Sequence, residues 1–408
     1  MQSAPQLADG RQKLEALTAL RFVAAACIVL HHLRGSFGIA GNAYSSLNLG
    51  AAVSFFFVLS GFVLAYAHPR LSGLSDAFAF IVKRWFRIWP LHFACLVILL
   101  ILMPPLLTEA ARSVQGWLEL VSNILLVQAW VPWSSFYFSF NPVSWSISIE
   151  WFFYLSFPFL LYLMLGRNSA RLALLVTLLP LIVLLVLCAA CDVPDYSEAR
   201  SQITTHGLIY INPFARLFEF AVGMALQRCT RGRKDSPELS RRMWILQLLA
   251  LALAAWFIAE GSTLNSRQWM PHVVAIWFGY SGGLPIWAFL IWAFSFSKAW
   301  PAAFLSNRVF VALGEASFAI YLVHFGIAQS AAKRLCSGLH IENSSFQLAL
   351  YFGLVVGVSF FLYYAIERPG MALGKFLAGC VYSKQGRSKS KPAPVQEIYG
   401  DSVERQSG

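Results

Sequence analysis

The stretch LALLVTLLPLIVLLVLCAAC, residues 172–191, is twenty residues long and contains no charged side chain. A helix that crosses the hydrocarbon core of a bilayer needs about 20 mainly apolar residues, so this stretch predicts a transmembrane helix. Runs of similar character recur along the chain, near residues 17–35, 49–68, 86–106, 144–165, 207–227, 243–260, 271–297, 309–330 and 347–366. The sequence therefore predicts an all-α, polytopic membrane bundle of about ten transmembrane helices.

The composition of the whole chain agrees with this fold class. Of its 408 residues, 58% are hydrophobic and 12% are charged, whereas about a quarter of the residues in an ordinary soluble domain are charged. A soluble core of this size has no room to bury so much apolar surface. We assign the net charge of +12 to the orientation of helices in the lipid bilayer, and we expect no nucleic-acid partner.

The segment 115–131, QGWLELVSNILLVQAWV, is shorter and amphipathic, so it either spans the membrane or lies in its interface. If it does not span, 24 Lys and Arg residues fall on the side of the two termini and six fall on the other side. Loops on the cytoplasmic side are enriched in Lys and Arg. This distribution predicts ten spans with both termini in the cytoplasm, and an external loop over 107–143 that lies partly on the membrane.

These spans divide the chain into three segments. Residues 1–16 form a cytoplasmic N-terminal segment, and residues 17–370 form the integral membrane domain. Residues 371–408 form a basic cytoplasmic tail. Its last part is rich in Ser, Lys and Pro, and we expect it to be disordered because such a segment cannot bury enough apolar surface to fold.

Charged and polar side chains inside the predicted spans are the first functional candidates, since burying a charge in a bilayer is costly. Arg21 and His32 are 11 residues apart, which is about 20° from alignment on a helix, so both side chains share one face. His31 points about 100° away from that face, which favours His32. The rise of about 16 Å between them places Arg21 near the cytoplasm and His32 in the outer half.

Three further motifs place polar residues in or beside spans. Arg84 and Arg87 lie three apart in KRWFRIWPLH, at the cytoplasmic interface, where ordinary anchoring arginines are the alternative. Glu150 lies in the outer third of its helix within SWSISIEWFFY. Tyr321 and His324 share a stripe with Ser317 in ASFAIYLVHF, where a packing histidine is the alternative. Arg216 and Glu219 are three apart and are expected to pair with each other.

Sorted by depth, these residues form two layers. Arg21, Arg84 and Arg87 lie toward the cytoplasm, where fixed positive charge suits a phosphate-bearing ligand. His32, Glu150 and His324 lie toward the outside, where a histidine with a carboxylate is suited to removing a proton from a hydroxyl group. The arrangement indicates a reaction that is supplied from one side of the membrane and completed on the other.

In order along residues 14–370, the motifs resemble the acyltransferase-3 family of integral membrane acyltransferases. The matching pieces are LTALRFVAAACIVLHHL with its Arg21-x10-His32 spacing, SFFFVLSGFVLAY (54–66), the Arg84-x2-Arg87 motif, SWSISIEWFFY, ASFAIYLVHF and IERPG (366–370). The resemblance implies a ten-helix core and an O-acyltransferase activity. Its implied substrates are cytoplasmic acyl-coenzyme A, most commonly acetyl-coenzyme A, and a hydroxyl group on a bacterial surface or exported glycan or on a small molecule. The implied location is the bacterial inner membrane, with polysaccharide assembly machinery as a possible partner.

The resemblance also implies roles for individual residues. It makes His32 the main catalytic candidate, with Arg21 needed for geometry or for the donor. It associates Arg84 and Arg87 with coenzyme A, and it matches Glu150 to an acidic residue after the Ser-Trp-Ser run. Members of the family often have two acidic residues in succession there. In this chain Trp151 follows Glu150, so one carboxylate has to fill the role.

The resulting hypothesis is that acyl-coenzyme A docks with its phosphates near Arg84 and Arg87 and its thioester beyond Arg21. His32, oriented by Glu150 or another carboxylate, then takes the proton of the attacking hydroxyl group. Ser60, in the sequence LSG, is an alternative covalent carrier, but no G-x-S-x-G pattern surrounds it. We expect no metal.

Two other classes of protein also fit the sequence. A proton-coupled transporter would also place Arg, Glu and His side chains inside ten spans, although no inverted repeat is visible in the sequence. An export or assembly partner for polysaccharide machinery would depend on other chains and would consume no thioester. Transfer or hydrolysis of acyl-coenzyme A by the purified protein distinguishes the enzyme from both.

Overall fold

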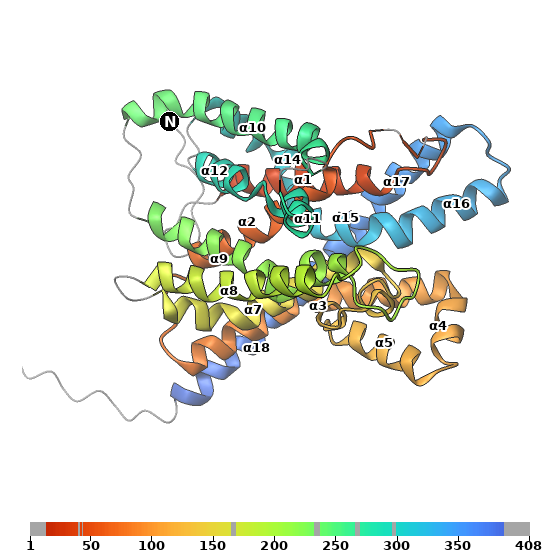
Figure 1. The fold of residues 1–408 in the computed structure, drawn as a ribbon, viewed down its shortest axis with the longest axis horizontal. Coiled ribbons are helices and arrows are strands. Elements are labelled where there is room, and N and C mark those ends of the chain that lie inside the picture. The colour runs from red at the N-terminus through yellow and green to blue at the C-terminus, as the bar shows by residue number, and fades with distance from the viewer. Residues whose placement is uncertain are drawn as a thin grey trace, which may run out of the picture.

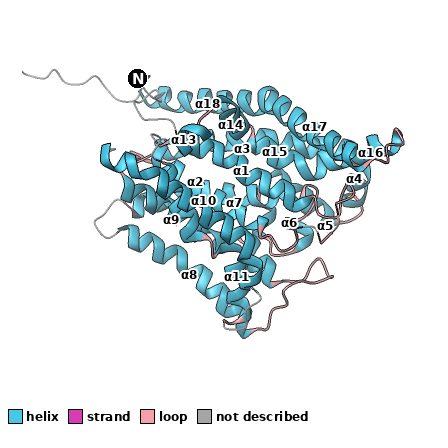
Figure 2. Cartoon of the chain, turned by 90° about the horizontal axis from the view of Figure 1, so that it is seen from above, coloured by secondary structure: helices cyan, strands magenta, loops and turns pink. Residues whose placement is uncertain are grey.

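The computed structural model describes residues 14–39, 41–42, 44–164, 169–231, 237–265, 270–295 and 299–386. Every regular element within these ranges is helical, and an isolated antiparallel bridge joins Trp133 to Ile203. Most of the predicted N-terminal segment and the end of the predicted tail lie outside the described residues. Figures 1 and 2 show the long helices gathered side by side into one bundle.

The elements follow one another along the chain without a strand in the described ranges. The first half forms α1 (Glu15–His32), η1 (Leu49–Ala51), α2 (Ala52–Ala67), α3 (Leu74–Leu102), α4 (Pro104–Ala110), α5 (Val114–Ile124), η2 (Gln128–Trp130), α6 (Ser134–Tyr137), η3 (Pro142–Ser144), α7 (Trp145–Leu163) and α8 (Ser169–Ala190). The second half forms η4 (His206–Ile211), α9 (Pro213–Thr230), α10 (Pro237–Asn265), α11 (His272–Ser281), α12 (Leu284–Phe294), α13 (Trp300–Leu305), α14 (Arg308–Glu315), α15 (Ser317–Val323), η5 (His324–Ala328), α16 (Gln329–Gly338), α17 (Ser344–Leu362), η6 (Tyr363–Glu367) and α18 (Arg368–Gly386). Of the short elements, η4, η5 and η6 are π-helices.

Within the described residues, nine helical stretches are long and apolar enough to cross a membrane. A tenth is added if the bent pair Arg308–Glu315 and Ser317–Gly338, which turns by 51°, counts as one span. This confirms the predicted all-α polytopic fold. In Figure 1, α4, α5 and α16 lie at one end of the bundle and the C-terminal part of α18 lies at the other. The orientation of the termini stays a prediction.

The segment 115–131 overlaps the helix α5, Val114–Ile124, whose 11 residues are too few to span a bilayer. Its N-terminus is capped by the Ser113 hydroxyl, which accepts a hydrogen bond from the backbone N–H of Gly116 at 3.0 Å. One face of α5 exposes Trp117, Leu118 and Val121. An exposed apolar face on a short amphipathic helix suits the membrane interface, in agreement with the non-spanning alternative.

Two helices are longer than their apolar runs predict. The third span begins at Leu74, so Arg84 and Arg87 lie well inside α3 and not at its entry. The last helical stretch continues without interruption from Ser344 to Gly386, and residues 371–386, which we assigned to the tail, belong to α18. Charged residues end an apolar run, but they do not end a helix, because Arg and Lys are good helix formers. In addition, α18 packs along α3, which supports both extensions.

The sequence LSG on α2 marks a close crossing of α2 with α9. A Cβ atom added at Gly61 would lie 2.0 Å from the carbonyl oxygen of Phe220, and one added at Gly223 would lie 1.9 Å from that of Val58. Only glycine fits at such distances, and small residues let membrane helices approach closely where lipid supplies no hydrophobic driving force. This crossing fixes the rotation of α2 and thereby the direction of Ser60.

Candidate active site

A cavity of about 160 Å³ lies inside the bundle, between α1, α2, α3, α7 and α15. This volume is below the roughly 300–1,000 Å³ of pockets that enclose drug-sized ligands, so the cavity suits the reacting end of a larger molecule. Six of the eight predicted site residues line it. The lining residues are Arg21, Val53, Phe56, Phe57, Leu59, Ser60, Val63, Leu64, Arg84, Arg87, Ser146, Ile147, Glu150, Tyr154, Ser317, Phe318 and Tyr321.

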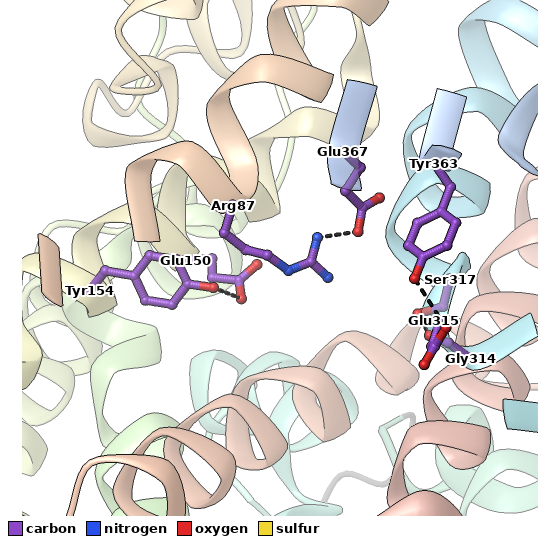
Figure 3. Close-up of polar contacts among 8 residues, drawn as sticks. All are labelled: Arg87, Glu150, Tyr154, Gly314, Glu315, Ser317, Tyr363 and Glu367. Atoms are coloured by element: carbon purple, nitrogen blue, oxygen red, sulfur yellow. Dashed lines mark hydrogen bonds and ion pairs between the residues drawn. The ribbon is translucent and has the colours of Figure 1, made fainter. Parts of the chain in front are cut away.

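The three arginines of the cavity differ in their partners. Arg87 forms an ion pair with Glu367 at the end of η6, and Figure 3 shows it reaching toward that residue. The Arg84 guanidinium donates to Nε2 of His68 at 3.0 Å. Arg21 finds no hydrogen-bond acceptor among the residues that the structure describes. The cavity wall therefore carries excess positive charge, with one guanidinium group available to an anionic ligand.

Glu150 accepts a hydrogen bond from the hydroxyl group of Tyr154, one turn further along α7 (Figure 3). Both side chains line the cavity together with the arginines. The predicted grouping of Glu150 with His32 in an outer layer was therefore wrong. Depth along a helix, which is what the sequence predicted, does not show which neighbouring helices the residue faces.

The two histidines that do not line the cavity contact each other. Nδ1 of His32, the last residue of α1, lies 3.0 Å from Nε2 of His324, the first residue of η5. The other ring nitrogen of His324, Nδ1, lies 2.7 Å from the backbone oxygen of Tyr321. His324 is fully buried, while His32 keeps partial exposure. The partner of His32 is therefore a histidine and not the carboxylate that we predicted.

Tyr321 forms the wall between the cavity and the histidine pair of His32 and His324. It lines the cavity, and its ring centroid lies 5.8 Å from that of His324. Its hydroxyl group donates to the backbone oxygen of Val143 at 3.1 Å and accepts from Ser146 at 2.8 Å. Phe56 lies beside it at 6.3 Å between ring centroids. A single layer of side chains thus separates the arginines from the histidines.

Ser60 also lines the cavity, because the neighbouring Gly61 is held against α9. Its hydroxyl group makes no hydrogen bond to a histidine or carboxylate in the part of the chain that the structure describes. A serine nucleophile needs an adjacent base within hydrogen-bond reach. The geometry therefore gives no support to Ser60 as a covalent carrier and is consistent with a role in lining the cavity.

Glu367, in the motif IERPG, was not among the site residues predicted from the sequence. Its side chain is 0% exposed and pairs with Arg87 across the bundle. The signal that the sequence offered was the position of Glu367, a carboxylate at the end of an apolar run for which we had assigned no partner. Nearby, the Tyr363 hydroxyl donates to Glu315 at 3.0 Å (Figure 3).

Arg216 and Glu219 form the predicted ion pair on α9, at 2.9 Å, and both are buried. Arg216 also donates to the hydroxyl group of Ser281 and lies over the rings of Phe57 and Tyr210. This pair therefore joins α9 to α2 and α11 inside the bundle. Across the described ranges, no group of three or more His, Cys, Asp or Glu side chains is arranged to hold a metal ion.

Fold and site together define a multi-pass helical membrane protein with a buried, positively charged cavity beside a histidine pair. The acyltransferase domain model of the acyltransferase-3 family matches residues 14–364. The acyltransferase MdmB of Streptomyces mycarofaciens is 31% identical over 323 residues, which cover 77% of this chain and 78% of that protein. No solved structure matches the chain significantly. The chain belongs to the acyltransferase-3 family and is an O-acyltransferase.

Proposed function

We propose that this enzyme transfers an acyl group, most simply acetyl, from cytoplasmic acyl-coenzyme A to a hydroxyl group of a surface or exported polysaccharide or of its lipid-linked precursor. We place it in the inner membrane of a bacterium. One observation carries the proposal. A small cavity lined by three arginines is separated from the histidine pair by the layer of side chains that contains Tyr321.

The arginines support a donor that carries phosphate groups. Guanidinium groups bind phosphate through charge-assisted hydrogen bonds, which are stronger than neutral ones. Arg21 is available for such a bond, while Arg84 and Arg87 already contact His68 and Glu367. The excess of Lys and Arg in the loops on the side of the termini supports an orientation in which the arginines lie toward the cytoplasm, where acyl-coenzyme A is made.

The size of the cavity supports a short acyl group. At about 160 Å³ it is too small for the whole coenzyme, so the adenosine part has to stay outside it. The thioester end enters, and the acyl group then meets the wall made by Phe56 and Tyr321. A small group such as acetyl suits this space better than a long fatty acyl chain.

The histidine pair supports the chemistry of the transfer. His32 accepts the proton of the acceptor hydroxyl group while the hydroxyl oxygen attacks the thioester carbon. The carbon–sulfur bond then breaks, and the departing thiolate takes the proton back from His32. The products are an ester and free coenzyme A, and His32 returns to its neutral form. The wall at Tyr321 has to open for the thioester to reach His32.

Mass spectrometry of the surface glycan tests this proposal. A strain without the gene is expected to lose one acyl mass from its glycan, and that mass identifies both the acyl group and the acceptor. The wild-type gene restores the acyl mass, whereas a gene carrying His32→Ala does not, although the variant reaches the same level in the membrane. Unchanged acylation in the His32→Ala strain would contradict the proposal.

A further inference from the structure

The two hydrogen bonds of His324 fix where its protons lie. The backbone oxygen of Tyr321 is an acceptor without a proton, so Nδ1 of His324 has to carry the hydrogen of the 2.7 Å contact. A neutral imidazole has one N–H group, and therefore Nε2 of His324 is an acceptor. His324 is 0% exposed, and no carboxylate of the described residues pairs with it, which favours the neutral form over a buried charge.

The tautomer of His32 follows from that of His324. Because Nε2 of His324 is an acceptor, the hydrogen of the 3.0 Å contact belongs to Nδ1 of His32. Neutral His32 therefore carries its lone pair on Nε2, the nitrogen that faces away from His324. A general base requires a ring nitrogen with a lone pair. The hydrogen bond made by one ring nitrogen determines that the other ring nitrogen carries this lone pair.

The surroundings hold both histidines in this arrangement. The π-helix η5 begins at His324, and π-helices inside α-helices are frequent at functional sites. The backbone oxygen of Tyr321 belongs to α15, so the helix holds this acceptor in place for His324. Gln329 donates to the backbone oxygen of His32 at 2.9 Å and fixes the end of α1.

We infer that His324 is a positioning residue, which holds His32 in the tautomer with its lone pair on Nε2 and so directs the base toward the acceptor hydroxyl group. A neutral histidine anchored to a backbone carbonyl thereby takes the place that a carboxylate fills in other catalytic histidine arrangements. This inference rests on the proposed function, since it assumes that His32 is the base.

Two substitutions at residue 324 separate this role from a packing role. His324→Leu keeps a side chain of similar bulk but removes the acceptor, so His32 loses its fixed tautomer. We expect kcat to fall by about 100-fold or more, because correct general base catalysis contributes about 10²–10⁴, with KM for acetyl-coenzyme A unchanged. His324→Gln places an amide oxygen near the position of Nε2, and we expect this variant to keep most of the wild-type kcat.

A spectroscopic readout makes the test independent of activity. In protein labelled with ¹⁵N-histidine, the resonances of His32 are assigned by their loss in His32→Asn. We expect a protonated Nδ1 and an unprotonated Nε2 in the wild type and in His324→Gln, and the ordinary tautomer, protonated on Nε2, in His324→Leu. A His32 ring protonated on Nε2 in the wild type would overturn the inference, as would wild-type kcat in His324→Leu. If His32→Ala is active, the proposed function fails instead.

Discussion

Arg87 and Glu367 form an ion pair although 280 positions separate them in the chain. The pair joins α3 to the end of η6, and Figure 3 shows Glu150 and Tyr154 on the opposite side of Arg87. Glu367 does not line the cavity, so it neutralises the charge of Arg87 from outside the cavity. Among the described residues, no carboxylate pairs with Arg21 or Arg84, so both keep a positive charge beside the cavity. Of the two, Arg84 is hydrogen-bonded to His68 and Arg21 is available to a ligand.

Removal of the Glu367 charge is expected to destabilise the protein. In Glu367→Gln, Arg87 keeps its charge but loses its ionic partner inside the bundle. Breaking a buried pair costs about 3–5 kcal/mol, and the 18% exposure of Arg87 places the loss near the lower end of that range. Thermal unfolding in lipid nanodiscs measures it. Glu315→Gln is the matched control, because Glu315 is exposed and bonds to a tyrosine, and its melting temperature is expected to stay close to that of the wild type. Equal melting temperatures for all three proteins would show that the ion pair of Arg87 with Glu367 does not stabilise the protein.

Replacement of Arg21 is expected to weaken donor binding. A hydrogen bond to a charged group contributes about 1.5–3 kcal/mol, which corresponds to roughly a 10- to 100-fold higher KM for acetyl-coenzyme A in Arg21→Gln. Initial rates at varied donor concentration measure the change. Arg112→Gln removes a positive charge from an exposed position, and its KM should remain at the wild-type value. A normal donor KM in Arg21→Gln would argue against a phosphate contact.

Neighbouring substitutions on α2 separate packing from covalent catalysis. Ser60→Ala is expected to retain activity within a few-fold, since no base contacts Ser60 in the described structure. Gly61→Ala adds a Cβ atom that would lie 2.0 Å from the Phe220 oxygen. Overpacking costs about 1–3 kcal/mol or more, so the yield of folded protein is expected to fall. Complete loss of activity in well-folded Ser60→Ala would restore the covalent alternative.

The wall between the cavity and the histidine pair is expected to limit the length of the acyl group. Phe56→Ala enlarges the space beside Tyr321 and should raise the kcat/KM ratio for butyryl- over acetyl-coenzyme A by about 10-fold, since one methylene group in an apolar pocket is worth about 1–3 kcal/mol. Phe55→Ala is the control, because Phe55 packs on Trp287 and does not line the cavity. An unchanged preference in Phe56→Ala would show that the acyl group does not reach this wall.

The sequence predicted the helical fold, and six of the eight predicted site residues line the cavity. Apolar length alone identifies spans, and the cost of a charge inside a span identifies candidates such as Arg21 and Glu150. It did not predict the contact of His32 with His324, which depends on the π-helix at His324 and on packing between distant segments. Periodicity on one helix shows which residues share a face, but it does not show which other segments that face contacts.

The most direct test of the central claim supplies acetyl-coenzyme A, labelled in its acetyl group, to membrane vesicles that contain the enzyme. Everted vesicles expose the cytoplasmic face, and we expect them to transfer label into a base-labile ester and to release an equal amount of free coenzyme A. Sealed right-side-out vesicles, and everted vesicles that carry His32→Ala at the same level, are expected to do neither. Equal transfer by wild-type and His32→Ala vesicles would contradict the account.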